Sequence, residues 1–153
     1  KGHAELARYL CSAAGASRNC STHSGATPLY FAAQFGHSAV VHFLCQDGRA
    51  ASSGSGAPLY VASQFGHAEV VRHLVEDRAD ADTVSRGGAA PLHIASQKGH
   101  LEVVRSLLEA RADKDRGLVG SPKAAADGGE RAMLDGATPL MLAAYAGGWE
   151  VVQ

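Results

Sequence analysis

Apolar residues recur along this chain at helical spacing, in pairs of short segments. Leu29, Ala32 and Ala33 stand at positions i, i+3 and i+4, and a second stripe of the same kind follows over residues 40–44. This spacing places apolar side chains on one side of an α-helix. Between the two stripes lies Gly36, and glycine is favoured where a helix ends in a left-handed turn. The pattern predicts two short amphipathic helices joined by a tight turn.

The predicted pair of helices occurs several times. The aligned segments are Lys1–Leu10 (KGHAELARYL), Gly25–Leu44 (GATPLYFAAQFGHSAVVHFL), Gly56–Leu74 (GAPLYVASQFGHAEVVRHL), Gly88–Leu107 (GAAPLHIASQKGHLEVVRSL) and Gly136–Gln153 (GATPLMLAAYAGGWEVVQ). A proline opens each first helix, where its missing N–H group costs no intrahelical hydrogen bond. We therefore expect first helices over residues 28–35, 58–65, 91–98 and 139–146. The expected second helices include 68–76 and 101–110.

The residue before each proline decides how the first helix is capped. Thr27 and Thr138 carry hydroxyl groups that can accept a hydrogen bond from the first helical turn. Ala57 and Ala90 stand at the same place in the two other units and offer no acceptor. Replacing either alanine by threonine is expected to stabilise the protein by about 1 kcal/mol.

These segments resemble ankyrin repeats over nearly the whole chain. Four x-Pro-Leu cores, three Gly-His turns after them and several Val-Val-x-x-Leu tails carry the resemblance, all in the same phase. The four core prolines are 30, 33 and 48 residues apart, and the family has a 33-residue period with the signature T-P-L-H-x-A. The resemblance implies an all-α fold, a solenoid of stacked helix-turn-helix units with short hairpin-like loops.

Neighbouring units must stack, because one helical pair cannot bury its apolar side alone. Within an array over residues 1–153 we expect the following division: a partial unit at 1–22 with only a second helix, units at 23–52, 53–85 and 86–116, an insertion at 117–134 and a partial unit at 135–153. Neither end carries a complete unit or a polar capping unit. We therefore expect a fragment of a longer array.

Two connections depart from the repeat period. The connection around residues 49–55 (RAASSGS) is three residues shorter than the repeat period requires, which predicts a truncated finger, the loop that joins one unit to the next. The connection after Glu109 is 15 residues longer than the period, and its residues 117–134 mix Gly, Pro and both charges without periodicity. Loops of this length in a compact domain are either functional or disordered. The composition favours a flexible, disordered loop.

Composition and charge limit the class of partner. The chain carries 14 Lys or Arg and 15 Asp or Glu, a net charge of −1, which gives no general attraction to nucleic acid or anionic membranes. No apolar run approaches the roughly 20 residues that span a bilayer. Cys11 and Cys45 each follow a core leucine and are expected to be small core residues, while Cys20 lies in a loop. Three cysteines without a disulfide spacing fit an intracellular, cytoplasmic location.

The eight histidines raise the question of a metal or catalytic site. Four follow a turn glycine at the repeat spacing, namely His3, His37, His67 and His100. This recurrence favours a structural role, such as a hydrogen bond to turn backbone. The resemblance implies that His93 bonds a neighbouring turn. His23, His42 and His73 have no partners at ligand spacing.

No pattern for catalysis is present. A zinc site needs about four converging Cys or His ligands, and the chain has no nucleotide loop, nucleophile motif or paired carboxylates. Asp77, Asp80 and Asp82 lie close together but lack the glycine and terminal glutamate of a calcium loop. We expect no enzyme activity, no cofactor, no metal and no small-molecule substrate.

The resemblance implies that another protein binds the concave face, at the turn tips and the exposed ends of the first helices. The residues of this chain at those ends are Gln34, Phe35, Gln64, Phe65, Gln97, Lys98 and Tyr145. Phe35 and Phe65 occupy equivalent positions in adjacent units, which predicts an aromatic ladder continued by Lys98. Exposed aromatic side chains beside amides and a cation are typical of a binding hot spot. The other interpretation is that each phenylalanine folds over its own glycine turn and packs on the next unit.

Two further interpretations of the function are open. The array can be the regulatory or targeting part of a larger enzyme or membrane protein whose functional domain lies outside these residues, since a fold does not determine a function. It can also be a degenerate array. The signs of relaxed constraint are the short connection, the insertion and Gly148-Trp149, which stand where the other units have His followed by a small or apolar residue.

Overall fold

The fold consists of short helices in series. The computed structural model describes residues 3–46, 57–85, 87–119 and 134–147, and these residues form helices and turns without a strand. The helices are α1 (His3–Ser12), α2 (Pro28–Gln34), α3 (Ser38–Cys45), α4 (Ala57–Phe65), α5 (Ala68–Glu76), α6 (Pro91–Lys98), α7 (Leu101–Glu109) and α8 (Pro139–Tyr145). The predicted all-α solenoid is confirmed, with helix ends within two residues of the predicted ones.

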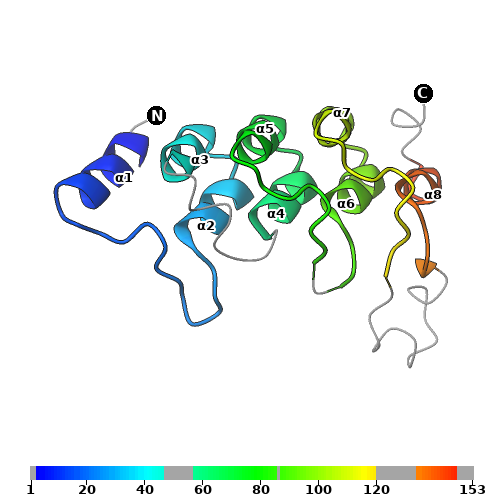
Figure 1. Ribbon diagram of the computed structural model, residues 1–153, viewed down its shortest axis with the longest axis horizontal. Coiled ribbons are helices and arrows are strands. Elements are labelled where there is room, and N and C mark those ends of the chain that lie inside the picture. The colour runs from blue at the N-terminus through cyan, green and yellow to red at the C-terminus, as the bar shows by residue number, and fades with distance from the viewer. Residues whose placement is uncertain (1–2, 47–56, 86, 120–133, 148–153) are drawn as a thin grey trace.

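The helices lie in two rows (Figure 1). One row contains α2, α4, α6 and α8, each in contact with the next, and the other contains α1, α3, α5 and α7. The connections between units extend away from the helices on one side of the molecule. The ends of the first helices therefore line up along the solenoid, one beside another.

The first helices begin where the sequence predicts a cap. The Tyr30 N–H donates to the Thr27 hydroxyl oxygen at 3.2 Å, and the Met141 N–H donates to that of Thr138 at 3.4 Å. The helices end at glycines in the left-handed region, with φ of 71° at Gly36. Local chemistry thus sets both ends of these helices.

The two alanines at the cap position behave differently from each other. Helix α4 includes Ala57 as its first residue, so the prediction that Ala57 flanks the helix is wrong. Alanine favours the helical conformation and has no side-chain acceptor that competes for it. Ala90 does flank α6, with φ −79° and ψ 164°, and its side chain makes no capping bond. Instead, the Nδ1 atom of His93 accepts from the Ala90 N–H at 3.2 Å.

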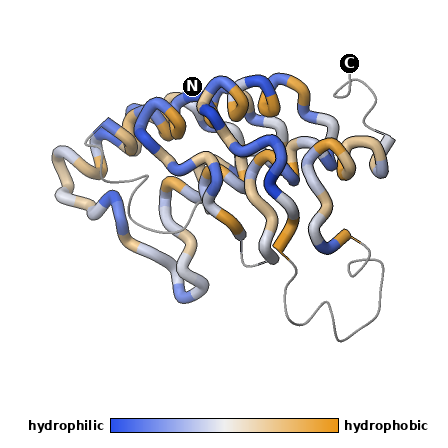
Figure 2. Tube along the Cα trace, turned by 45° about the vertical axis from the view of Figure 1, so that its right-hand side comes forward, coloured by the Kyte–Doolittle hydropathy of each residue, from blue (hydrophilic) through white to orange (hydrophobic). Residues whose placement is uncertain are grey.

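The hydrophobic core lies between the two rows of helices, and hydrophobic positions recur along both rows in Figure 2. Each of the three units with two described helices contributes the leucine of its Pro-Leu core and the leucine of its second helix. These leucines are at most 4% exposed: Leu29, Leu44, Leu59, Leu74, Leu92 and Leu107. Alanines of the first helices are also buried, as at Ala33 and Ala62, but Ala144 is exposed. Burial therefore repeats with the period of the units.

The ends of the long insertion are anchored. Leu118 exchanges backbone hydrogen bonds with the chain beyond the insertion, since its N–H donates to the Ala137 oxygen and its oxygen accepts from the Gly136 N–H, both at 2.9 Å. The Val119 N–H donates to the Gly88 oxygen at 3.3 Å. Residues 120–133 of the predicted flexible loop, and residues 47–56 with the predicted truncated finger, lie outside the described residues.

Candidate functional site

The residues predicted to bind a partner lie at the carboxyl ends of the first helices. The exposed fraction is 63% for Phe35, 50% for Phe65 and 59% for Tyr145. Lys98 is also exposed, and the three glutamines at these ends are partly exposed. Because α2, α4, α6 and α8 pack in sequence, these ends form one row along the solenoid.

The two phenylalanines pack on their own turns and still remain exposed. The Phe35 ring stacks on the His37 ring, with centroids 6.3 Å apart and planes 29° apart. Phe65 stacks on His67 in the same way, at 6.4 Å and 26°. One face of each ring therefore rests on the turn. The rest of each side chain is accessible.

The histidines of the Gly-His turns connect neighbouring units. The Nε2 atom of His67 hydrogen bonds to the Gln34 backbone oxygen, and that of His100 to the Gln64 oxygen, both at 3.1 Å. The predicted structural role is confirmed for these two, and the bonded carbonyl belongs to the preceding unit. The His67 ring also passes so close to Gly36 that a Cβ atom there would lie 2.7 Å from it. These bonds hold the ends of α2 and α4 in place.

His93 is the most buried titratable group described in this fold, at 1% exposure. Its Nδ1 atom accepts from Ala90, and its Nε2 atom hydrogen bonds to the Arg116 oxygen at 2.9 Å. Because Nδ1 acts as an acceptor, the ring is neutral and carries its proton on Nε2. Burial lowers the pKa of His93. The predicted bond from His93 to a neighbouring turn is confirmed.

A polar pocket between α3 and α5 was missed by the sequence analysis. It has a volume of about 210 Å³ and is lined by His42, Cys45, Gln46, His73, Glu76 and Asp77. The centroids of the His42 and His73 rings lie 5.2 Å apart, and the His73 Nδ1 atom lies 3.5 Å from a Glu76 carboxylate oxygen. The repeat gives no signal for this pair, because His42 and His73 occupy different positions in their units.

Cys45 lines this pocket, and its thiol is buried. Burial, with the Asp77 carboxylate beside it, raises the pKa of the Cys45 thiol to about 12. Asp77 Oδ2 is buried without a hydrogen-bond partner. In the described part of the chain, no three His, Cys, Asp or Glu side chains are arranged to hold a metal ion. Cys45 is buried as a core residue, whereas Cys11 is only partly buried against the core and Cys20 is exposed.

Comparison with known families agrees with the geometry of the units. Residues 1–53 and 49–117 match a family described as ankyrin repeats, in three copies. This chain belongs to the ankyrin repeat family. No curated protein matches it.

Ankyrin repeats generally mediate protein–protein interaction and are typically non-catalytic. Among the described residues of this ankyrin array, no helix combines the length and apolar composition needed to cross a bilayer. A protein partner is therefore the class of ligand to consider for the exposed ends of its first helices.

Proposed function

We propose that this ankyrin array is a scaffold that binds another protein through an aromatic stripe. The stripe consists of Phe35 and Phe65, continued by Lys98 and Tyr145, with the glutamines Gln34, Gln64 and Gln97 beside them. It lies at the carboxyl ends of α2, α4, α6 and α8 and corresponds to the expected concave face.

The observation that carries the proposal is the exposure of two large aromatic rings at equivalent positions of adjacent helices. Phe35 and Phe65 are 63% and 50% exposed, although the leucines of the same helices are buried. Large exposed apolar groups that lie side by side are frequent at protein interfaces.

The two rings are also held in place before a partner arrives. Each stacks on a turn histidine of its own unit, and the bond from His67 to the Gln34 oxygen fixes the two units relative to each other. A partner that binds fixed side chains loses less conformational entropy than one that must order them. Lys98 at the next position favours a partner with an acidic group beside its apolar residues.

The test compares proteins captured from cell extract by three immobilised chains. The double variant Phe35→Ala, Phe65→Ala is expected to lose captured partners by about tenfold or more, since each hot-spot aromatic contributes on the order of 2 kcal/mol. Phe31→Ala is the matched control, because Phe31 lies on α2 and is 43% exposed but is outside the stripe. Far-ultraviolet circular dichroism must remain that of the parent chain.

Two outcomes would contradict the proposal. An equal loss of captured partners in the Phe31→Ala variant would place binding outside the stripe. Unfolding of the double variant would assign the two rings to the core rather than to a binding surface.

The expected division into units belongs to the same proposal. The helical pairs α2–α3, α4–α5 and α6–α7 fall within 23–52, 53–85 and 86–116. The exposed thiol of Cys20 supports a reducing, cytoplasmic location for the scaffold.

A further inference from the structure

The aromatic stripe contains two parallel rows of side chains. The tip row consists of the residues directly before the turn glycines, namely Phe35, Phe65 and Lys98. The amide row consists of the residues one position earlier, namely Gln34, Gln64 and Gln97. The equivalent residue after α8 is Ala146, whose methyl group offers no comparable contact. The tip row therefore presents three contacts in the order aromatic, aromatic, cation.

Helix packing sets the spacing of the tip row. Helix α2 contacts α4, and α4 contacts α6, and the axes of packed helices are about 8–10 Å apart. Equivalent side chains of adjacent units are separated by about the same distance. A polyproline II segment has three residues per turn and rises about 3.1 Å per residue, so its side chains at i, i+3 and i+6 share one side and lie about 9 Å apart. A β-strand places i and i+3 on opposite faces. The polyproline II segment matches the tip row, and the strand does not.

The amide row distinguishes this conformation from an α-helix, in which side chains seven residues apart are also separated by about 10 Å. The three glutamine side chains are partly exposed, and within the described residues their amides make no hydrogen bond with the protein. Polyproline II has no internal backbone hydrogen bonds, so its carbonyl oxygens can accept from these amides. The carbonyl groups inside an α-helix are already bonded to its own backbone. A helix would leave the amide row without backbone partners.

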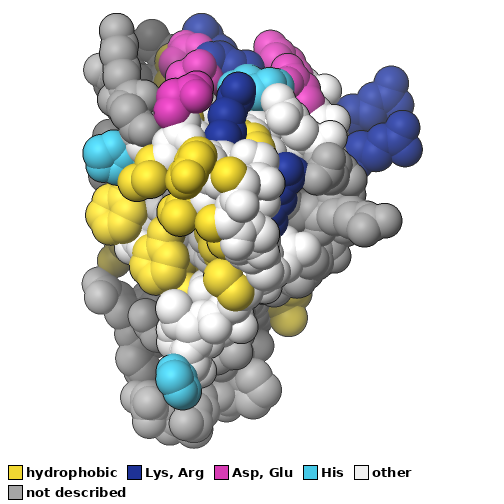
Figure 3. All heavy atoms as spheres, turned by 90° about the vertical axis from the view of Figure 1, so that its left-hand side faces the viewer, with side chains coloured by type: hydrophobic (Ala, Val, Ile, Leu, Met, Phe, Trp, Pro, Cys, Tyr) yellow, Lys and Arg dark blue, Asp and Glu magenta, His cyan; other side chains and the backbone are white. Residues whose placement is uncertain are grey.

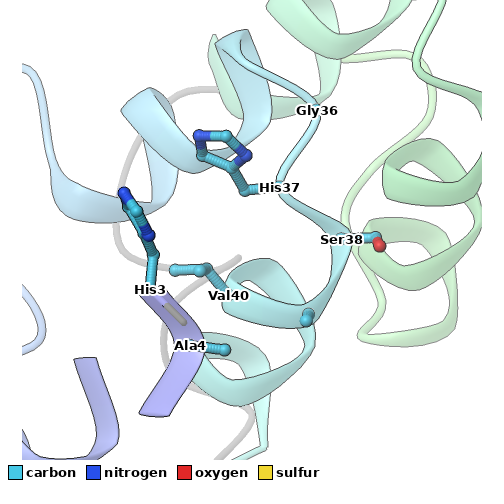
Figure 4. A pocket seen from close by; sticks show the side chains of 7 residues that line it. His3, Ala4, Gly36, His37, Ser38 and Val40 are labelled. Atoms are coloured by element: carbon cyan, nitrogen blue, oxygen red, sulfur yellow. The ribbon is translucent and has the colours of Figure 1, made fainter. Parts of the chain in front are cut away.

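The contacts of the tip row are open to a partner. Phe35 and Phe65 each rest on a turn histidine, and the rest of each ring is accessible. Lys98 is exposed and makes no ion pair within the part of the chain that the structure describes. Beside His37, which supports Phe35, lies a pocket of about 280 Å³ (Figure 4). Among the described residues, the tip row is therefore limited to three contacts.

We propose that the aromatic stripe binds a polyproline II segment of the partner that carries two apolar side chains three residues apart and a carboxylate three residues further along. This inference rests on the proposed function and specifies the partner's chemistry. The apolar side chains pack on Phe35 and Phe65, and the carboxylate pairs with Lys98. The amide row donates hydrogen bonds to the carbonyl groups between them. The spacing of the units and the complementary charge at Lys98 support this occupant.

The test measures the fluorescence anisotropy of labelled seven-residue peptides with the full chain. The peptides LPPLPPE and EPPLPPL carry the predicted spacing in the two chain directions, and their prolines favour the polyproline II conformation. One of them is expected to bind at least about tenfold more tightly than LPLPPPE, which has the same composition but leucines two residues apart. This comparison uses the parent chain, so it does not depend on the folding of any variant.

Substitutions in the chain then locate the bound peptide. Phe35→Ala and Phe65→Ala should each weaken binding at least about tenfold, with the circular dichroism of the parent retained. Exposed apolar side chains also gather at the end of the molecule that contains α1 (Figure 3). Leu10→Ala in α1 is the control for binding there and should change the affinity less than about twofold.

A charge exchange tests the contact with the carboxylate. Lys98→Glu should weaken binding by about threefold, since an exposed ion pair contributes little. The same peptide with lysine in place of its glutamate should recover that loss. Lys114→Glu changes the net charge equally, and Lys114 is exposed outside the stripe, so it should leave the affinity unchanged.

The inference is overturned if neither LPPLPPE nor EPPLPPL binds more tightly than LPLPPPE, or if a helical peptide with leucines seven residues apart binds as tightly. It is also overturned if Leu10→Ala weakens binding as much as Phe35→Ala, or if the lysine peptide recovers nothing. Capture from extract that requires Phe35 and Phe65 while the peptides fail would sink this inference alone. Capture that is independent of the two rings would sink the proposed function.

Discussion

Helices α6 and α1 belong to the same solenoid, yet they differ completely in burial. Helix α6 buries six of its residues, Pro91 to Ser96, whereas α1 buries none. Both contain apolar residues at helical spacing, so the difference does not come from their own sequences. Helix α6 has helices on both sides in its row and a partner in the other row, whereas α1 contacts α3. In a stacked array, neighbouring units supply most of the stability of each helix.

The largest effect is expected from the same substitution made at equivalent leucines. Leu107→Ala in α7 removes a side chain with 0% exposure and should lower the free energy of unfolding by about 3–4 kcal/mol. Leu10→Ala in α1, where the side chain is 45% exposed, should cost less than about 1 kcal/mol. Urea unfolding of both variants measures the difference. Equal losses would mean that the end unit is as well packed as the interior.

The second comparison concerns a buried histidine in the folded and the unfolded chain. His93→Gln should cost about 2 kcal/mol at pH 7, because His93 makes two buried hydrogen bonds. The pKa of His93 is lowered in the folded state, so the unfolded chain binds the proton first as the pH falls. The stability of the parent is therefore present above about pH 6.5 and decreases below it.

Unfolding measured from pH 7.5 to pH 5 tests this sign. The difference in stability between parent and His93→Gln should narrow as the pH falls. His93→Gln is compared with the parent chain at every pH in the same buffer. A constant difference for His93→Gln would contradict the account.

The third comparison concerns a buried cysteine in the folded and the unfolded chain. The pKa of Cys45 is raised to about 12, so its thiol keeps its proton in the folded state while the unfolded thiol loses it above about pH 9. Stability is fully present below that pH and decreases as the pH rises toward 12, by on the order of 2 kcal/mol at pH 10.5.

Cys45→Val introduces the residue found at the same position of α5, Val75, and should remove this alkaline loss. Identical alkaline unfolding of parent and Cys45→Val would exclude Cys45 as the source.

The smallest effect compares a capped helix with an uncapped one. Ala90 has nearly the backbone angles of Thr138, whose hydroxyl caps α8, so Ala90→Thr should stabilise the protein by about 1 kcal/mol. Ala90→Val has the same shape without the hydroxyl and is the matched control. The thermal midpoint of the threonine variant should exceed that of the valine variant. The reverse order would show that space at Ala90 matters more than the cap.

The features predicted correctly from the sequence are those set by local chemistry or by the repeat. Pro28, Thr27 and Gly36 define the start, cap and end of α2 within a dozen residues. The repeat then places His67 and His93 in structural roles. In each case the deciding groups are near in sequence or recur at the period of the fold.

The features missed depend on contacts between units. His42 and His73 occupy different positions in their repeats, and only the packing of α3 on α5 brings their rings together. The sequence likewise predicts Phe35 as exposed or packed but not as both, because its stacking on His37 is a matter of side-chain geometry. The identity of the partner could not be predicted, because it depends on the surface of the other protein.

The most direct test of the scaffold proposal is site-specific photocrosslinking in cell extract. A photoreactive phenylalanine analogue is placed at position 35, at position 65 or, as the control on the same helix as Phe35, at position 31. We expect the same crosslinked protein from positions 35 and 65 and none above background from position 31. Crosslinking at position 31, with none at position 35 or position 65, would contradict a binding surface on the aromatic stripe.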